Sequence, residues 1–236
     1  MSNRWFSISA VCIFWLAATL APQPASAEQQ DHVAAVKQSL QKSAAALHQY
    51  QWVETTVVSI KGEEKSRKQE SCYYGADGKI EKVPIGGEPQ SEGKKKRGLR
   101  GKIVENKKEE ISDSMKEAVA LVKQYIPPDP ARIQAAKDEG RLSVVPPDAH
   151  GGTKVVIKDY LKAGDSLTLA MNVATDQLSA VTVSTFTDKA KDAVGLNVAF
   201  GSFPDGTVYA EKIALEVKSE DLAVAIANSG YKKIAG

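Results

Sequence analysis

The chain is poor in cysteine, histidine and aromatic residues. Its 236 residues include two cysteines and three histidines, and aromatic side chains make up 6% of the sequence. Cys12 lies in an apolar N-terminal segment that we expect to be removed, which leaves Cys72 without a partner. A single thiol cannot close an internal disulfide, so the fold must be held by its core. We interpret Cys72 as a small buried apolar residue, with a redox or intermolecular site as the alternative.

Neither sign of charge dominates the composition. The chain has 31 basic and 29 acidic residues, and Arg4 is the only basic residue before residue 28, so the rest carries about +1. This balance gives no general attraction to nucleic acid, which we do not expect as a partner. The longest apolar run, residues 8–20, has about 13 residues, fewer than the roughly 20 that span a bilayer. We therefore predict no transmembrane anchor after cleavage.

The N-terminus has the pattern of a cleavable signal peptide. Arg4 supplies the positive charge, residues 8–20 the apolar stretch, and residues 25–27 (Ala-Ser-Ala) the small-residue cleavage box. Cleavage is predicted between Ala27 and Glu28, with an uncleaved anchor as the alternative. Residues 1–27 are thus a predicted signal peptide, and residues 28–236 a single domain of a periplasmic or secreted protein.

The remaining chain alternates little between helix and strand. Asp31 is a predicted N-cap of a first helix that reaches Leu47, and helices are also predicted at 111–126 and 130–140. Residues 84–110, rich in glycine and charge, are predicted to form a mobile basic loop. Strands are predicted at 51–60, 65–74, 79–83, 141–145, 154–160, 166–172, 178–187, 194–200, 207–217 and 222–227.

This order of elements favours an α+β fold. Short turns between strands, and the absence of βαβ repetition, indicate an antiparallel meander. Leu167, Leu169 and Met171 share one face of their strand, which indicates a sheet with one buried side. We expect one curved antiparallel sheet whose concave face is covered by helices.

Few motifs point to catalysis or metal binding. Residues 164–168 (Gly-Asp-Ser-Leu-Thr) match the opening of the GDSL hydrolase signature, but all three histidines precede Ser166, and a turn that starts a strand explains the same letters. His150 before two glycines is interpreted as an exposed hairpin residue. His32 and His48 lack Cys or carboxylate neighbours at metal-ligand spacing, so we predict no metal and no cofactor.

Two groups of residues are candidates for binding. A cluster of cations suits an anionic partner, such as a phosphate, a lipid headgroup or an acidic protein, although a solvated loop is the alternative. Apolar and aromatic side chains are candidates to line a ligand cavity on the concave face, with ordinary core packing as the alternative. The cations are Lys94, Lys95, Lys96, Arg97, Arg100 and Lys102, and the apolar candidates are Trp52, Tyr74, Leu167, Leu169, Met171, Phe186 and Phe200.

Three stretches resemble the LolA/LolB-type periplasmic lipoprotein carriers and the related envelope-stress sensor domains. They are the first helix with Tyr50-Gln51-Trp52, Tyr73-Tyr74 and Asp77-Gly78; Ser166-Leu167-Thr168-Leu169 through Thr175-Asp176-Gln177-Leu178; and Asn197-Val198-Ala199-Phe200 before Pro204-Asp205-Gly206. The chain is also similar to uncharacterised exported proteins. The resemblance implies an incomplete barrel whose apolar hollow shelters an acyl chain or a lipoprotein, by burial of methylenes at about 0.8 kcal/mol each.

Three functions follow as hypotheses. The first is a non-enzymatic periplasmic protein that binds a hydrophobic or lipidated ligand. The second is an envelope sensor or protein-interaction module that uses a sheet face or the basic loop to bind another envelope protein. The third, and least favoured, is a serine hydrolase built on Ser166.

Overall fold

A computed structural model of the chain describes residues 38–86, 99–187 and 192–234, and for residues 99–110 only the backbone. The predicted signal peptide with its cleavage site at Ala27 and Glu28, the N-cap Asp31, and the cations Lys94, Lys95, Lys96 and Arg97 lie outside these residues.

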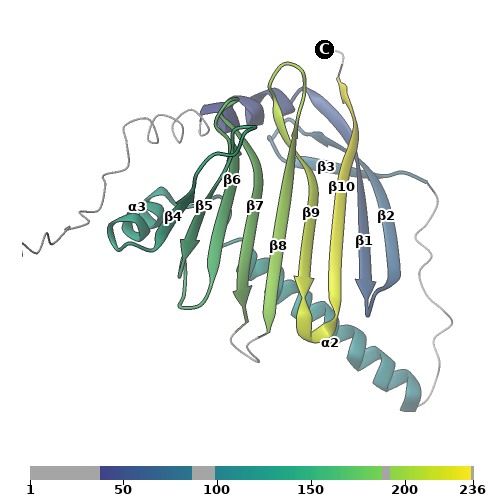
Figure 1. The fold of residues 1–236 in the computed structure, drawn as a ribbon. Coiled ribbons are helices and arrows are strands. Elements are labelled where there is room, and N and C mark those ends of the chain that lie inside the picture. The colour runs from purple at the N-terminus through teal and green to yellow at the C-terminus, as the bar shows by residue number, and fades with distance from the viewer. Residues whose placement is uncertain (1–37, 87–98, 188–191, 235–236) are drawn as a thin grey trace, which may run out of the picture.

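The described residues form one ten-stranded sheet in which every neighbouring pair of strands is antiparallel (Figure 1). The spatial order is β3-β2-β1-β10-β9-β8-β7-β6-β5-β4, so β3 and β4 are the two edges. The strands are β1 (Tyr50–Ile60), β2 (Glu63–Tyr74), β3 (Ile80–Pro84), β4 (Leu142–Val145), β5 (Gly152–Lys158), β6 (Ser166–Asn172), β7 (Gln177–Phe186), β8 (Ala193–Ser202), β9 (Val208–Val217) and β10 (Leu222–Lys233). The predicted α+β fold with a curved antiparallel sheet is confirmed.

Sequence-distant strands meet in the middle of this sheet. The chain runs as a meander from β4 to β10, and β10 then pairs with β1 over its whole length, from Ile60 opposite Leu222 to Tyr50 opposite Lys233. The N-terminal hairpins β1 to β3 therefore extend the sheet beyond the C-terminal strand. This pairing explains why β10 runs to Lys233, beyond the predicted end at residue 227, although its last residues are polar.

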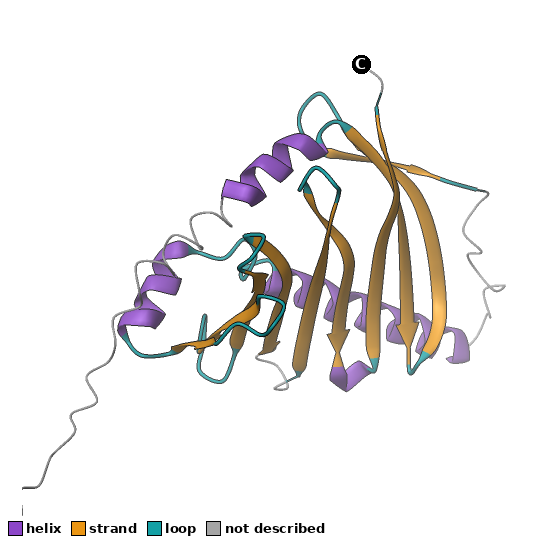
Figure 2. Ribbon diagram, turned by 45° about the horizontal axis from the view of Figure 1, so that its top comes forward, coloured by secondary structure: helices purple, strands orange, loops and turns teal. Residues whose placement is uncertain are grey.

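Helices pack against one face of the sheet, called the inner face below. α2 (Leu99–Val122) runs diagonally across it, and residues 38–47 form a second helix that leads through a short turn into the start of β1 (Figure 2). α3 (Pro130–Asp138) begins as predicted, because the Asp129 carboxylate accepts a hydrogen bond of 2.9 Å from the Ala131 backbone N–H and Pro130 occupies the first turn. A short 3₁₀ helix, η1 (Lys218–Glu220), joins β9 to β10.

The prediction of a loop through residue 110 was wrong for its last twelve positions. α2 begins at Leu99, so residues 99–110 are helical and continue into the predicted helix without a break. Lysine and glutamate are strong helix formers, and between Leu99 and Val122 they are interrupted by a single glycine, Gly101, and by no proline. The frequent glycines and prolines of the charged segment before Leu99 predicted irregular structure beyond the point where they end.

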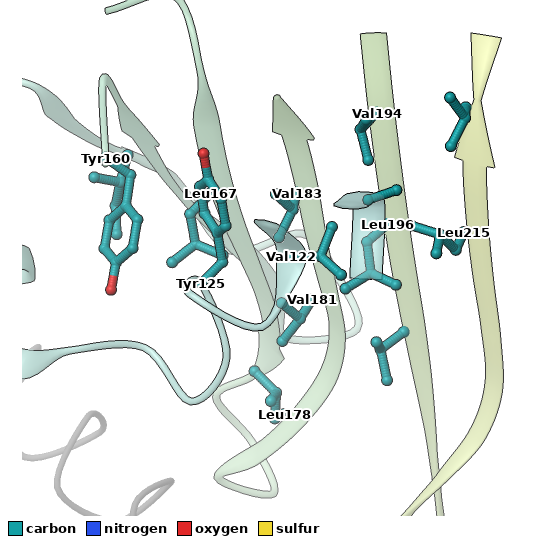
Figure 3. Close-up of a cluster of buried hydrophobic side chains, with 14 of the residues drawn as sticks. Val122, Tyr125, Tyr160, Leu167, Leu178, Val181, Val183, Val194, Leu196 and Leu215 are labelled. Carbon is teal, nitrogen blue, oxygen red and sulfur yellow. The ribbon is translucent and has the colours of Figure 1, made fainter. Parts of the chain in front are cut away.

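The packed core lies between α2 and strands β5 to β10. Figure 3 shows buried side chains of the helix and of the segment after it facing those of the strands. Fully burying an aliphatic side chain of this size contributes about 1.5–3 kcal/mol. The packed core includes Ala118, Val122, Tyr125, Ile157, Tyr160, Leu167, Met171, Leu178, Val181, Val183, Val194, Leu196, Val198, Leu215, Val217 and Leu222.

A buried carboxylate ties the segment after α2 to the sheet. Asp165, only 3% exposed, accepts a 2.6 Å hydrogen bond from the Tyr125 hydroxyl and others from the backbone N–H groups of Tyr160 and Lys162. The Tyr125 hydroxyl also lies 2.8 Å from Thr185 Oγ1. Burial, and then the Asp165 carboxylate, raise the pKa of Tyr125, so it stays a donor at neutral pH. The aspartate of the Gly-Asp-Ser motif thus has a structural role here.

Candidate ligand-binding site

Seven rings gather on β1 and the turn before it, β2, β10 and the β8–β9 hairpin, and form what we call the aromatic cluster. Trp52 lies between Tyr74 and Tyr231, with ring centroids 5.7 Å from each. Tyr231 in turn contacts Tyr209 at 4.5 Å and Phe203 at 5.2 Å. The cluster is completed by Tyr50, stacked on Phe203, and by His48, stacked on Tyr74.

The aromatic cluster sits where the sheet divides. The β9–β10 ladder ends at Lys212 opposite Ala227, although β10 continues along β1 to Lys233. Beyond that point, side chains join the two strands: Asn228 Nδ2 donates to the Ala210 carbonyl at 2.9 Å, and the Tyr231 hydroxyl donates to the same oxygen at 3.4 Å. The rings of Tyr209 and Tyr231 meet beside this opening, so divergence of the strands creates room for aromatic side chains.

Charged groups are buried next to the rings. Glu54 on β1 and Glu70 on β2 lie directly opposite each other and are 9% and 7% exposed. Each has its own cation, since Lys82 Nζ lies 2.5 Å from a Glu54 oxygen and Lys68 Nζ 2.6 Å from a Glu70 oxygen. The buried carboxylates are therefore paired, which limits the cost of their desolvation.

Cys72 lies in the same region, opposite Trp52 across β1 and β2, and is fully buried. Burial, and then the negative charge of Glu54, raise the pKa of its thiol above the ordinary value, so the protonated form prevails at neutral pH. The prediction that Cys72 is a small buried residue is confirmed.

Two buried polar atoms in this region have no hydrogen-bond partner. Within the described ranges they are the only such side-chain atoms: the indole nitrogen Nε1 of Trp52, a donor, and the amide oxygen Oδ1 of Asn228, an acceptor. Trp52 is 6% exposed. Buried polar groups in proteins are nearly always paired, so an orphan donor and an orphan acceptor on neighbouring strands mark this place as unusual.

The predicted ligand-binding residues fall into three places. Trp52 and Tyr74 belong to the aromatic cluster. Leu167 and Met171 are buried in the packed core, and Leu169 and Phe200 are half-buried against it, which matches the alternative of core packing. Phe186 was predicted to line the concave inner face, and this prediction was wrong. Leu167 pairs with Val183, so Phe186, three residues after Val183, points to the outer face, where Lys162 Nζ lies 4.1 Å from its ring centroid.

Sequence reasoning left several residues of the site unassigned. Phe203 and Tyr209 flank the turn around Pro204-Asp205-Gly206, and Asn228 and Tyr231 lie beyond the predicted end of the last strand. A signal was present, because aromatic residues on both sides of a tight turn approach each other in a hairpin. Of the predicted cations, Arg100 and Lys102 lie in the first turn of α2, whose side chains are outside the described set.

The residues of the hydrolase hypothesis are spread over the molecule. Ser166 begins β6, opposite Lys158 and Ser184. His48 stacks on Tyr74, and exposed His150 occupies the turn before β5, as predicted, where its backbone N–H donates to Asp148 at 2.8 Å. In the portion of the chain with described side chains, no group of three or more His, Cys, Asp or Glu is arranged to hold a metal ion.

The fold and the site define an α+β protein with an open antiparallel sheet and an aromatic site on its inner face. No helix within the described residues is long and apolar enough to cross a bilayer. No protein-family description matches the chain, and no curated protein matches its sequence.

Two solved structures are similar in overall arrangement. A DUF1329 family protein from Desulfovibrio piger aligns with 85% of this chain and 94% of its own, at 10% identity and a TM-score of 0.31. MucB, solved in complex with MucA(peri), aligns with 85% of this chain and 100% of its own, at 9% identity and a TM-score of 0.23. The likeness is a weak one of overall fold, and at these TM-scores it supports no argument about function.

Proposed function

We propose that this is a non-enzymatic, exported protein that binds an amphipathic ligand with an apolar chain at the aromatic cluster. The observation that carries the proposal is the pair of unpartnered buried polar atoms, Trp52 Nε1 and Asn228 Oδ1, within a set of stacked rings. Aromatic faces offer large apolar contact area, and a few polar atoms among them fix a ligand's orientation.

The packed core restricts where such a ligand binds. Side chains of Ala118 and Val122 from α2 occupy the inner face opposite Leu167 and Leu196, so that part of the face is filled. The aromatic cluster is less enclosed, because Tyr74, Phe203, Tyr209 and Tyr231 are half-buried and His48 is exposed. We therefore place the ligand at β1, β2 and β10, and each methylene that it buries contributes about 0.8 kcal/mol.

Export to the periplasm or the medium is part of the proposal. Its support is the signal-peptide pattern of residues 1–27, with cleavage between Ala27 and Glu28. N-terminal sequencing of the protein recovered from the cell envelope tests it, and a protein that still begins at Met1 would contradict it.

Trp52 provides a direct test of binding. It is the only tryptophan after residue 27, so fluorescence of the mature chain reports on the site. We expect a lysophospholipid, added below its micellar concentration, to shift the emission and to appear as a bound mass in native mass spectrometry. Tyr231→Ala should weaken binding about tenfold or more, whereas Phe186→Leu, on the outer face, should not.

Two outcomes would contradict the proposal. One is a protein that stays empty after purification from exporting cells and whose Trp52 emission does not respond to lipid. The other is esterase activity of the purified protein that disappears in Ser166→Ala, because this would make the protein an enzyme.

A second candidate function, binding of a partner protein, is favoured by the edges of the sheet. β3 and the residue after it expose Ile80, Val83 and Ile85, at 46%, 50% and 44%. Edge strands with exposed apolar side chains are suited to pairing with another chain. A photo-crosslinking residue at Val83 should then capture one discrete protein in intact cells, and the same residue at outward-facing Thr182 on central strand β7 should not. Absence of a discrete product at Val83 would remove this candidate.

A further inference from the structure

The proposed ligand site also indicates what the ligand's polar group is. We infer that the ligand carries a secondary amide next to its apolar chain, with the amide carbonyl accepting from Trp52 Nε1 and the amide N–H donating to Asn228 Oδ1. This inference rests on the proposed function and adds the chemical class of the ligand.

The register places the two orphan atoms on the same face of neighbouring strands. Asn228 lies directly opposite Glu54, and Trp52 lies two residues before Glu54 on β1, where the register with β10 shifts between Gln51 and Val53. Diagonal neighbours in a regular ladder are about 7–8 Å apart, and the bulge at Trp52 changes this spacing locally. If the bridging group is a single amide unit, the amide and its two hydrogen bonds of about 2.9 Å together span about 8 Å.

The chemistry of the pair selects among polar groups. An indole N–H only donates, and an amide oxygen only accepts. One ligand group that satisfies both must accept one hydrogen bond and donate another, and a secondary amide does so at two separate atoms. An ester or a tertiary amide has a carbonyl but no N–H, so it would leave Asn228 Oδ1 unpaired.

The surroundings favour a neutral group over a charged one. Glu54 and Glu70 are paired with Lys82 and Lys68, so these four groups balance one another's charge beside the orphan atoms, while Lys233 Nζ lies over the Tyr50 ring, 5.6 Å from its centroid. The raised pKa of Cys72 keeps its thiol neutral as well. A buried neutral amide avoids the desolvation penalty that a charged headgroup would meet there.

The apolar chain has a surface of its own beside these atoms. Tyr74 and Tyr231 flank Trp52, and Phe203 contacts Tyr231 at 5.2 Å. Tyr74, Phe203 and Tyr231 are half-buried and His48 is exposed, so the chain reaches the rings from the side near His48. The ligand class is thus an N-acyl amide, with the chain on the rings and the amide between β1 and β10.

Four probes test the inference by calorimetry on the purified protein: N-methyldecanamide, methyl decanoate, N,N-dimethyldecanamide and N-methylacetamide. We expect the first to bind about tenfold more tightly than the ester and the tertiary amide, which corresponds to about 1.4 kcal/mol for the extra hydrogen bond. N-Methylacetamide should not bind measurably, because it lacks the chain. Mass spectrometry of the recovered ester verifies that it stays intact.

Variants assign the effect to the two atoms. Asn228→Leu should abolish the preference, so that the secondary amide and the ester bind about equally tightly. Trp52→Phe should weaken all three decanoyl probes to a similar degree, because each has a carbonyl. Asn197→Leu is the matched control, since Asn197 on β8 is exposed and donates to Thr182, and it should keep the tenfold preference.

The outcomes separate this inference from the proposed function. Equal binding of the three decanoyl probes by the wild-type protein overturns the amide inference but leaves the proposed ligand binding intact. In that case water is the partner of both orphan atoms. Binding of N-methylacetamide as tight as that of N-methyldecanamide overturns it too, because a peptide backbone would then be the source of the amide. Failure of every probe and of the lysophospholipid contradicts the proposed function itself. The wild-type ratio decides even if Asn228→Leu fails to fold.

Discussion

The packed core and the aromatic cluster share one sheet but differ in how their polar groups are treated. In the packed core, the buried Asp165 carboxylate accepts hydrogen bonds from Tyr125 and from backbone N–H groups. In the aromatic cluster, Trp52 Nε1 and Asn228 Oδ1 are buried without partners. The polar groups of the first region are satisfied within the fold, and two polar atoms of the second are not.

The comparison suggests where function resides on an open sheet. A site that binds a ligand gives up some stability, because its groups are satisfied only in the complex. Substitutions in the packed core should therefore change stability more than binding, and substitutions in the aromatic cluster should do the reverse.

The largest effect is expected for Leu167→Ala in the packed core. Leu167 is fully buried, and removal of its side chain leaves a cavity, so the free energy of unfolding should fall by about 2–5 kcal/mol. Urea denaturation measures the change. Ile80→Ala, at an exposed edge position, should change it by less than about 0.5 kcal/mol. Similar values for the two variants would show that the core is not packed as described.

Tyr125→Phe should have the next largest effect. It removes the hydroxyl that donates to Asp165 and contacts Thr185, at a cost of about 1–3 kcal/mol in the free energy of unfolding. Tyr73→Phe, at a half-buried position on β2, is the control and should be close to neutral. Affinity for the decanoyl probes should be the same in both variants, and a selective loss in Tyr125→Phe would break the proposed division.

Alkaline pH should weaken both regions. Burial raises the pKa of Tyr125, of Tyr231 and of Tyr74, so folding favours their protonated forms. A raised folded-state pKa contributes stability that is complete below the unfolded value of about 10 and is lost as the pH rises above it. Denaturation between pH 8 and 11 should show this fall.

Phenylalanine variants assign the alkaline loss to a region. Tyr125→Phe should reduce the alkaline loss of stability that comes from the packed core. Tyr231→Phe should reduce the loss that comes from the aromatic cluster. Phenolate absorbance followed in parallel should show these tyrosines ionising only as the protein unfolds. A profile that neither variant changes would mean that these groups do not control alkaline stability.

The smallest change in stability is expected at a glycine beside the rings. A Cβ on Gly201 would lie 2.8 Å from the Tyr209 ring, whereas one on Gly195 of the same strand has nothing within 4 Å. Gly201→Ala should displace Tyr209, cost about 1 kcal/mol or slightly more, and weaken probe binding several-fold. Gly195→Ala should leave affinity unchanged. Equal affinities for these two variants would exclude Tyr209 from the site.

Much of the fold was predictable because local signals agreed with the tertiary structure. All ten predicted strands are present, and β6 matches its predicted bounds at Ser166 and Asn172. Errors arose where the local sequence pattern did not determine the structure. Residues 99–110 were predicted as a loop because they follow a charged segment rich in glycine and proline, and Phe186 was assigned to the wrong face because the register of β7 was not known.

The candidate site was predictable only in part. Trp52 and Tyr74 were identified from their place in successive strands, but Tyr231 and Asn228 lie in a polar C-terminal segment with little strand character. They become part of the site because β10 pairs with β1, more than 160 positions earlier in the chain. No periodicity within the last strand reports on that pairing.

The amino-acid sequence by itself determined the antiparallel α+β class, the signal-peptide pattern and the absence of a second cysteine after residue 27, because composition, alternation and turn residues act over a few positions. Only the tertiary structure decided which side chains meet. The divergence of β9 from β10 brings Tyr209 to Tyr231 and leaves Trp52 and Asn228 with unpartnered atoms on one face. The physical reason is that strand pairing and register are set by the whole sheet, and a local stretch of sequence contains no information about its distant partner.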